Sequence, residues 1–216
     1  FYRFDESHVK EYTMQMWGNL YPDNYKFKYP KAGETNSIVD ILIYDLPSQK
    51  TMKLDIGSQN DQYIPRIKWT RDANTLALMR MNRHQNNMEL LLADATTGQI
   101  SPMHTETDKA YIDVPDTWIF LTDGKHFLIT SEKDGYNHIY MYDLKGNLVK
   151  QITTGNYDVV RIAGIDEKNK KIYYTSKESS PINTDLYVIN FDGKKKTKLS
   201  DKPGTYSASF SNGCHY

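Results

Sequence analysis

The chain has 216 residues, which is enough to bury a sizeable core, and all-β domains often reach this length without dividing. Its 27 Lys and Arg balance its 27 Asp and Glu, which argues against a nucleic-acid partner because nucleic-acid binders carry a concentrated basic face. No apolar run approaches the ~20 residues of a membrane helix. The N-terminus, FYRF, lacks the basic and apolar regions of a signal peptide. We therefore expect no membrane segment and no nucleic-acid site in this chain.

The first 56 residues predict three strands with a long arm inserted among them. Strands are expected at residues 1–5, 38–44 and 50–56, and residues 9–17 are also extended in character. Residues 18–37 contain two prolines, two glycines and little periodicity, so they predict an irregular arm. Long loops of this kind in a compact domain are usually functional or disordered.

The arm, residues 12–37, is rich in aromatic side chains. They are Trp17, Tyr21, Tyr25, Phe27 and Tyr29. Such a composition argues against disorder and indicates that the arm packs on another surface.

The clearest pattern in the chain is a run of four short strands at residues 118–121, 126–131, 138–143 and 148–153. β-branched and aromatic residues fill the strands, and polar or glycine-containing turns separate them. The pattern predicts a four-stranded antiparallel meander.

Similar units lie on both sides of this meander. One has strands at residues 65–69, 75–81, 89–93 and 99–103, and the other at residues 159–165, 171–176, 185–189 and 197–199. The residues that end each third strand, Asp45, Asp94, Asp143 and Asn190, lie about 47 to 49 residues apart. Four-stranded repeats of this length are typical of β-propeller blades, whereas a β-sandwich would show shorter and less regular periods.

We therefore predict an all-β fold, a β-propeller fragment of about four blades. An incomplete blade would cover residues 1–56, whole blades residues 64–107, 116–156 and 158–200, and the first strand of a further blade residues 205–216. Both ends resemble strands in progress, so we expect a piece of a larger protein. Two such chains could complete one ring, or residues 205–211 could close the four blades on themselves.

The search for chemistry gives no catalytic, cofactor-binding or metal-binding residue. The chain has no Gly-x-Ser-x-Gly elbow, no phosphate-binding glycine loop, no His-Glu-x-x-His and only one cysteine, Cys214. Its six histidines are scattered singly. Residues 134–137 lack the spaced acids of a calcium loop, and the lysine run at residues 194–198 is expected to be a solvated turn.

Several segments nevertheless resemble the N-terminal propeller of the dipeptidyl peptidase IV family, in the prolyl oligopeptidase group of serine peptidases. They are YPKAGETN at residues 29–36, NRHQN at 82–86, SEKDGYNHIY at 131–140, QITTG at 151–155, YYTS at 173–176 and DLY at 185–187. The resemblance runs in order through the whole chain. It implies an eight-bladed propeller ahead of an α/β-hydrolase domain, in an enzyme that removes N-terminal dipeptides with Pro or Ala in second place.

The resemblance also implies where the chemistry lies. The family's Ser, Asp and His triad belongs to the α/β-hydrolase domain, which is absent from this chain, and its paired glutamates precede the segment that matches residues 1–6. The aromatic–arginine pair that lines the substrate cleft in some members is replaced here by Asp113 and Val114. We therefore expect no enzyme activity from this chain and a serine-type dipeptidyl peptidase as its parent.

The family's arm contributes to a homodimer interface, so the resemblance implies that Trp17, Tyr21, Tyr25, Phe27 and Tyr29 pack against a second subunit. The alternative is that the arm folds back on its own blade. Expected partners are the parent's own hydrolase domain, a peptide substrate and a second copy of the protein. The lone cysteine and the lack of glycosylation sequons favour a bacterial-type, periplasmic or extracytoplasmic parent. A stand-alone propeller that serves as a protein-binding module is the alternative function.

Overall fold

The computed structural model describes residues 1–216 and consists of five antiparallel sheets with almost no helix. A three-stranded sheet has the order β1–β4–β5, with β1 at Tyr2–Asp5, β4 at Ile38–Asp45 and β5 at Lys50–Lys53. A two-stranded ribbon is formed by β2 (Glu11–Met16) and β3 (Asp23–Lys28). The one helical segment, the 3-10 turn Asn212–Cys214, and the chain as a whole offer no helix that could cross a membrane.

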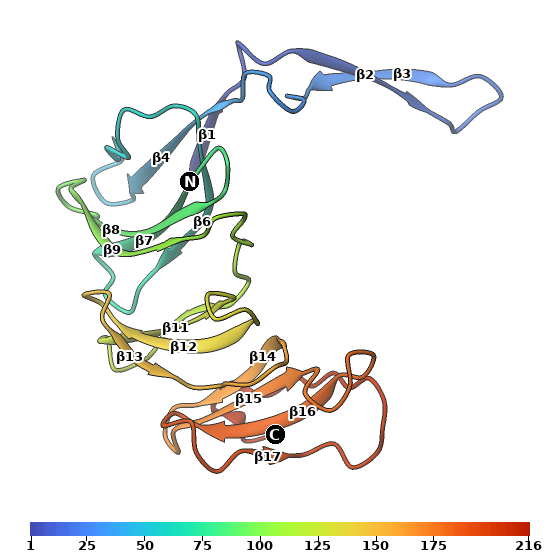
Figure 1. Cartoon of the computed structure of the whole chain (residues 1–216). Helices are drawn as coiled ribbons and strands as arrows, with labels where there is room; N and C mark the ends of the chain where they lie inside the picture. Colours follow the sequence, from blue (N-terminus) through green and yellow to red (C-terminus); the bar gives the residue numbers. More distant parts are fainter.

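The other three sheets are four-stranded meanders. The first contains β6 (Gln62–Trp69), β7 (Thr75–Asn82), β8 (Asn87–Asp94) and β9 (Ile100–Thr107). The second contains β10 (Trp118–Phe120), β11 (His126–Ser131), β12 (His138–Asp143) and β13 (Leu148–Gln151). The third contains β14 (Val159–Asp166), β15 (Lys171–Ser176), β16 (Asp185–Asn190) and β17 (Thr197–Lys198). The sheets follow one another along an arc, and the β2–β3 ribbon projects from one end of it (Figure 1).

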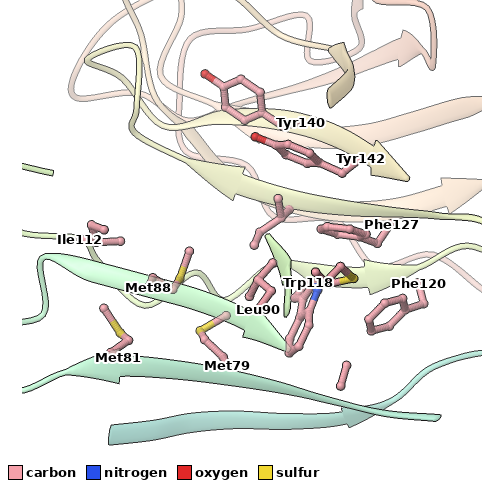
Figure 2. Packing of buried hydrophobic residues seen from close by; sticks show 13 residues of the cluster. Met79, Met81, Met88, Leu90, Ile112, Trp118, Phe120, Phe127, Tyr140 and Tyr142 are labelled. Atoms are coloured by element: carbon pink, nitrogen blue, oxygen red, sulfur yellow. The ribbon is translucent and has the colours of Figure 1, made fainter. Parts of the chain in front are cut away.

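Each inner sheet is covered on both faces, which explains why its strands do not alternate between apolar and polar residues. In β11, Phe127 and Ile129 belong to the core shared with the β6–β9 sheet, whereas Leu128 between them belongs to the core shared with the β14–β17 sheet. Figure 2 shows the first of these cores, where methionines of β7 and β8 meet aromatic rings of β10 to β12. The all-β, propeller-like fold predicted from the sequence is thus confirmed, while the number of blades stays a prediction.

The regular spacing of the aspartates has a local cause. Asp94 accepts hydrogen bonds from the backbone N–H groups of Thr96 and Thr97, and Asp143 accepts them in the same way from Lys145 and Asn147. Side-chain hydrogen bonds from Thr96 and Asn147, together with these backbone bonds, lower the pKa of the two carboxyl groups. The repeated aspartate therefore fixes the turn that joins the third and fourth strands in both the β6–β9 and the β10–β13 sheet.

Neighbouring sheets are also joined by hydrogen bonds between residues about one repeat apart. Lys68 Nζ donates to the Trp118 carbonyl at 2.7 Å, and Arg71 Nε donates to the Phe120 carbonyl at 3.1 Å. The backbone N–H of Thr122 donates to Glu167 Oε2 at 2.7 Å across the next pair of sheets. The repeat length therefore matches both the strand pattern and the contacts between sheets.

The prediction of an irregular arm was wrong over residues 23–28. These residues form β3, which pairs with β2 in register from Glu11↔Lys28 to Met16↔Asp23. The two prolines lie just outside the strand, at positions 22 and 30, where they remove no donor from the ladder. The overlooked signal is the alternation of Tyr25, Phe27 and Tyr29.

The predicted strand at residues 205–211 was also wrong. The segment keeps an alternating pattern of burial, but its only pairing is an isolated bridge between Thr205 and Thr184, and the Phe210 ring packs 4.5 Å from that of Tyr173 on the β14–β17 sheet. The segment's contacts are with β14–β17, including a hydrogen bond from Arg161 to the Ala208 carbonyl at 2.7 Å. Self-closure of the blades through residues 205–211, which would place them on β1, does not occur.

A buried carboxylate fixes the end of the last sheet. Asp185 is fully buried and accepts hydrogen bonds from Ser179 Oγ and Ser200 Oγ. It also forms an ion pair with Lys198 Nζ at 2.9 Å. Burial opposes ionisation, but the hydrogen bonds from the two serines and Lys198 outweigh it and lower the pKa of Asp185. A group whose pKa is lowered by folding stabilises the fold above its unfolded pKa.

Replacing Asp185 with Ala should therefore reduce the free energy of unfolding at pH 7 by about 2–3 kcal/mol, because three donors lose their acceptor. The difference from wild type should shrink as the pH falls below about 4 and through the lowered pKa, where the wild type also loses the ionised carboxylate. Urea unfolding at pH 7 and pH 3 measures both. Asp201→Ala, at an exposed aspartate, is the control and should change stability by less than about 0.5 kcal/mol. A pH-independent difference would contradict this account of Asp185.

Candidate functional site: a projecting hairpin and an acidic cleft

The arm forms a β-hairpin, residues 11–28, whose root is fixed and whose tip is exposed. At the root, Lys10 pairs with Glu34 at 2.7 Å, and Lys28 Nζ donates to the Val9 carbonyl at 3.0 Å. Arg83, in the β7–β8 turn, donates to the Glu34 carbonyl at 3.0 Å and thus joins the root to the β6–β9 sheet. The hairpin is therefore held at its base but leaves its tip free to contact another surface.

The five predicted interface residues divide into two groups. Trp17 and Tyr21, at the tip, are 72% and 80% exposed, and Tyr25 and Tyr29 are also exposed. Phe27 is half-buried, with its ring centroid 5.4 Å from that of Tyr25 and 5.8 Å from those of Tyr12 and Tyr29. Phe27 thus stabilises the hairpin itself, whereas Trp17 and Tyr21 are available to a partner.

The alternative that the arm folds back on its own blade is not what the structure has. The ribbon projects away from the arc of sheets (Figure 1), and Leu20 at its tip is 87% exposed. Exposed apolar clusters of this kind are typical of surfaces that bind another protein.

A cleft between two sheets is the second feature. The β9–β10 connection and the β11–β12 loop lie side by side and line a cavity of about 560 Å³. The charged residues that line this acidic cleft are Glu106, Asp108, Asp113, Asp116, Glu132 and Lys133. No motif search points to them, because the acids come from separate loops. In a meander, every second connection emerges at the same end of the sheet. This rule could have predicted that the β9–β10 connection and the β11–β12 loop lie close together.

The cleft is electrostatically unbalanced. Burial raises the pKa of Glu106, although a hydrogen bond from Ser131 Oγ at 2.8 Å opposes the rise. Burial and the nearby charge of Asp113 raise the pKa of Glu132. The single lining cation, Lys133, directs its ammonium to the Tyr142 hydroxyl at 2.5 Å and over the Tyr140 ring at 4.1 Å, so it forms no ion pair with these acids.

One histidine and two lysines of the lysine run have structural partners within the fold. His138 is fully buried, and its ring nitrogens contact Thr153 Oγ1 at 3.0 Å and the Gly155 carbonyl at 2.9 Å. Within the lysine run, Lys196 pairs with Glu178 and Lys198 with Asp185. No three His, Cys, Asp or Glu side chains gather in a geometry that could hold a metal ion.

Comparison with known proteins gives a consistent set of relatives. The family model described as the dipeptidyl peptidase IV N-terminal region matches residues 1–216. An inactive dipeptidyl peptidase 10 from Mus musculus is 34% identical over 191 residues, which cover 82% of this chain and 24% of that protein. A probable dipeptidyl-aminopeptidase B from Arthroderma gypseum is 30% identical over 228 residues, which cover 95% of this chain and 24% of that protein.

Solved structures agree in fold. The crystal structure of Porphyromonas gingivalis dipeptidyl peptidase 4 is 39% identical with a TM-score of 0.89, covering 99% of this chain and 30% of that one. A putative dipeptidyl aminopeptidase IV from Bacteroides ovatus is 26% identical with a TM-score of 0.86, covering 100% of this chain and 34% of that one. The chain therefore spans about a quarter of the length of the curated relatives that it matches.

Proposed function

Because the chain belongs to the dipeptidyl peptidase IV family, whose N-terminal region it matches from residue 1 to residue 216, we propose that it is the non-catalytic propeller portion of a dipeptidyl peptidase. The parent would be a serine exopeptidase that removes Xaa-Pro and Xaa-Ala dipeptides from peptide N-termini. The observation that carries this proposal is the agreement of family model and fold over the whole chain.

In this proposal the propeller portion gates access of the peptide substrate to a companion α/β-hydrolase domain. The arrangement of the sheets supports such a role, because residues from three neighbouring sheets line one cleft. The parent would act in the periplasm or another extracytoplasmic compartment. This placement rests on the lone cysteine, the lack of sequons and the similarity to the Porphyromonas gingivalis enzyme.

We also propose that the arm hairpin takes part in a homodimer. Trp17, Tyr21, Tyr25 and Tyr29 would contact the second subunit, and Phe27 would hold the hairpin in shape. The fixed root of the hairpin supports this role, since a preorganised surface loses less entropy when it binds.

A second candidate is a protein-binding propeller without peptidase activity. It is favoured by one observation, namely that the Mus musculus relative is named an inactive dipeptidyl peptidase. Membership of the family therefore does not by itself imply catalysis.

The two candidates are separated by incubating the full-length protein with decapeptides that differ only in Pro, Ala or Gly at the second position. The peptidase proposal predicts the appearance of an N-terminal dipeptide by mass spectrometry, fastest with Pro or Ala. Intact decapeptides after prolonged incubation with a folded protein would favour the binding module.

A further inference from the structure

Several carboxylates of the acidic cleft have no positively charged partner within the chain. Among its acids, Asp116 pairs with Arg66 at 3.1 Å and Glu106 accepts a hydrogen bond from Ser131. Asp108, Asp113 and Glu132 form no ion pair, and Asp113 and Glu132 are exposed at the surface of the cleft. Three unpaired carboxylates around one cavity create a negative potential that attracts a cation.

Two hydroxyl groups that are accessible from the cavity, those of Thr117 and Thr130, have no hydrogen-bond partner within the chain. Thr117 and Thr130 line the cavity and are 8% and 7% exposed, yet neither side-chain hydroxyl makes a hydrogen bond within the chain. Two mostly buried threonines whose free hydroxyls open into one cavity are available to bond the polar atoms of a ligand. This observation is independent of the acids.

The remaining lining defines the shape of the ligand. Met88, Ile112, Val114 and Val160 give the cavity an apolar wall beside its acids, and Tyr111 lies at its edge with half of its surface exposed. A cation with a long aliphatic stem, such as a lysine or arginine side chain, can cover the apolar wall and place its charge at the carboxylates. A bare metal ion would not use the apolar wall, and the acids do not group around one coordination point.

We propose that the acidic cleft is a specificity subsite that binds a basic side chain of an extended peptide. The guanidinium or ammonium group contacts Asp113 and Glu132, and the hydroxyls of Thr117 and Thr130 bond the peptide's polar atoms deeper in the cavity. The identification of the occupant as a peptide rests on the proposed function. The preference for a basic residue rests on the cleft itself.

The test uses the full-length protein and fluorescein-labelled pentapeptides that differ only in Arg, Gln or Glu at the third, fourth or fifth position. The bond after the second residue is N-methylated to prevent cleavage, so that fluorescence anisotropy reports binding alone. At one of these positions the Arg peptide should bind about tenfold more tightly than the Gln peptide, and the Glu peptide more weakly still. The preference should fall as salt is raised from 50 mM to 500 mM, because exposed charges are screened.

The variant Asp113→Asn/Glu132→Gln should abolish the preference for Arg. Both side chains are exposed and form no hydrogen bond within the chain, so the variant should fold. The matched control Asp192→Asn/Asp201→Asn removes two exposed carboxylates outside the cleft and should keep the preference. Thr130→Val should weaken binding of all three peptides without changing their ranking, which separates the hydroxyl contact from the charge contact.

Three results would overturn the proposal: equal affinity for Arg and Gln peptides at every position, a preference that survives in the Asp113/Glu132 variant, or no binding of any peptide. Release of dipeptides from a short uncharged substrate is measured in parallel. If dipeptides are released but the binding assay shows no preference for Arg, the subsite is wrong and the proposed function stands. If binding prefers Arg but no dipeptide is released, the subsite stands and the peptidase assignment is wrong.

Discussion

Replacing Trp17 and Tyr21 with alanine in the full-length protein should convert a homodimer into a monomer. The two side chains form the exposed tip of the arm hairpin, and large aromatic anchors at the centre of an interface each contribute about 2 kcal/mol or more. Loss of both removes about 4 kcal/mol or more and should weaken dimerisation by a factor of about 1,000 or more. Sedimentation velocity or light scattering at micromolar concentration measures the change in mass.

The control is Trp69→Ala, which removes a half-exposed tryptophan, 49% exposed, from β6 instead of from the hairpin. The control should leave the dimer intact. Phe27→Ala is a poorer probe, because its ring packs on Tyr12, Tyr25 and Tyr29 and its loss should disorder the hairpin. A dimer that is unchanged by the Trp17/Tyr21 variant would mean that the hairpin is not the interface.

The second large effect is expected at Gly146, in the turn between β12 and β13. A methyl group at this position would overlap the carbonyl oxygen of Met103 in β9, which belongs to the neighbouring sheet. Gly146 also has a φ of 81°, a left-handed conformation that costs other residues about 1–2 kcal/mol. Gly146→Ala should therefore reduce the free energy of unfolding by about 3 kcal/mol or more, because steric overlap adds about 1–3 kcal/mol to the conformational cost.

The same sheet offers a control for this prediction. Gly124, in the β10–β11 turn, has a φ of 64°, but a methyl group there would meet no atom within 4 Å. Gly124→Ala should show the conformational cost alone, about 1–2 kcal/mol. Urea unfolding of the two variants compares them directly. Equal destabilisation would contradict the close packing of the β12–β13 turn on the neighbouring sheet.

The repeat and the fold class could be predicted from the sequence because the same local turn chemistry recurs along the chain. The aspartates at 94 and 143 fix equivalent turns, so their spacing predicts the repeat and hence the propeller-like fold. Within β11, alternate residues enter two different cores, which is the reason that its pattern shows no polar face. Local turn chemistry and two-sided burial are both visible in the residue order.

The structure of other segments could not be predicted because it depends on which sheet or loop packs against them. Residues 205–211 have the alternation of a strand, but Phe210 packs on the β14–β17 sheet and the segment makes one isolated bridge in place of a ladder. The prolines that flank β3 favour an irregular arm, but they lie outside the strand. The alternating aromatics within it favour pairing with β2. The acidic cleft combines acids from separate loops, and only the sheet order brings Asp113 and Glu132 to one cavity.

Under the proposed function this chain frames a peptidase active site, and the catalytic serine belongs to another part of the same polypeptide. A fluorophosphonate, which reacts with activated serines, can be used to label the full-length protein, and mass spectrometry then maps the modified peptide. We expect a single labelled serine outside residues 1–216 and loss of dipeptide release in proportion to labelling. A labelled serine within residues 1–216, with loss of activity, would rule out this division of roles.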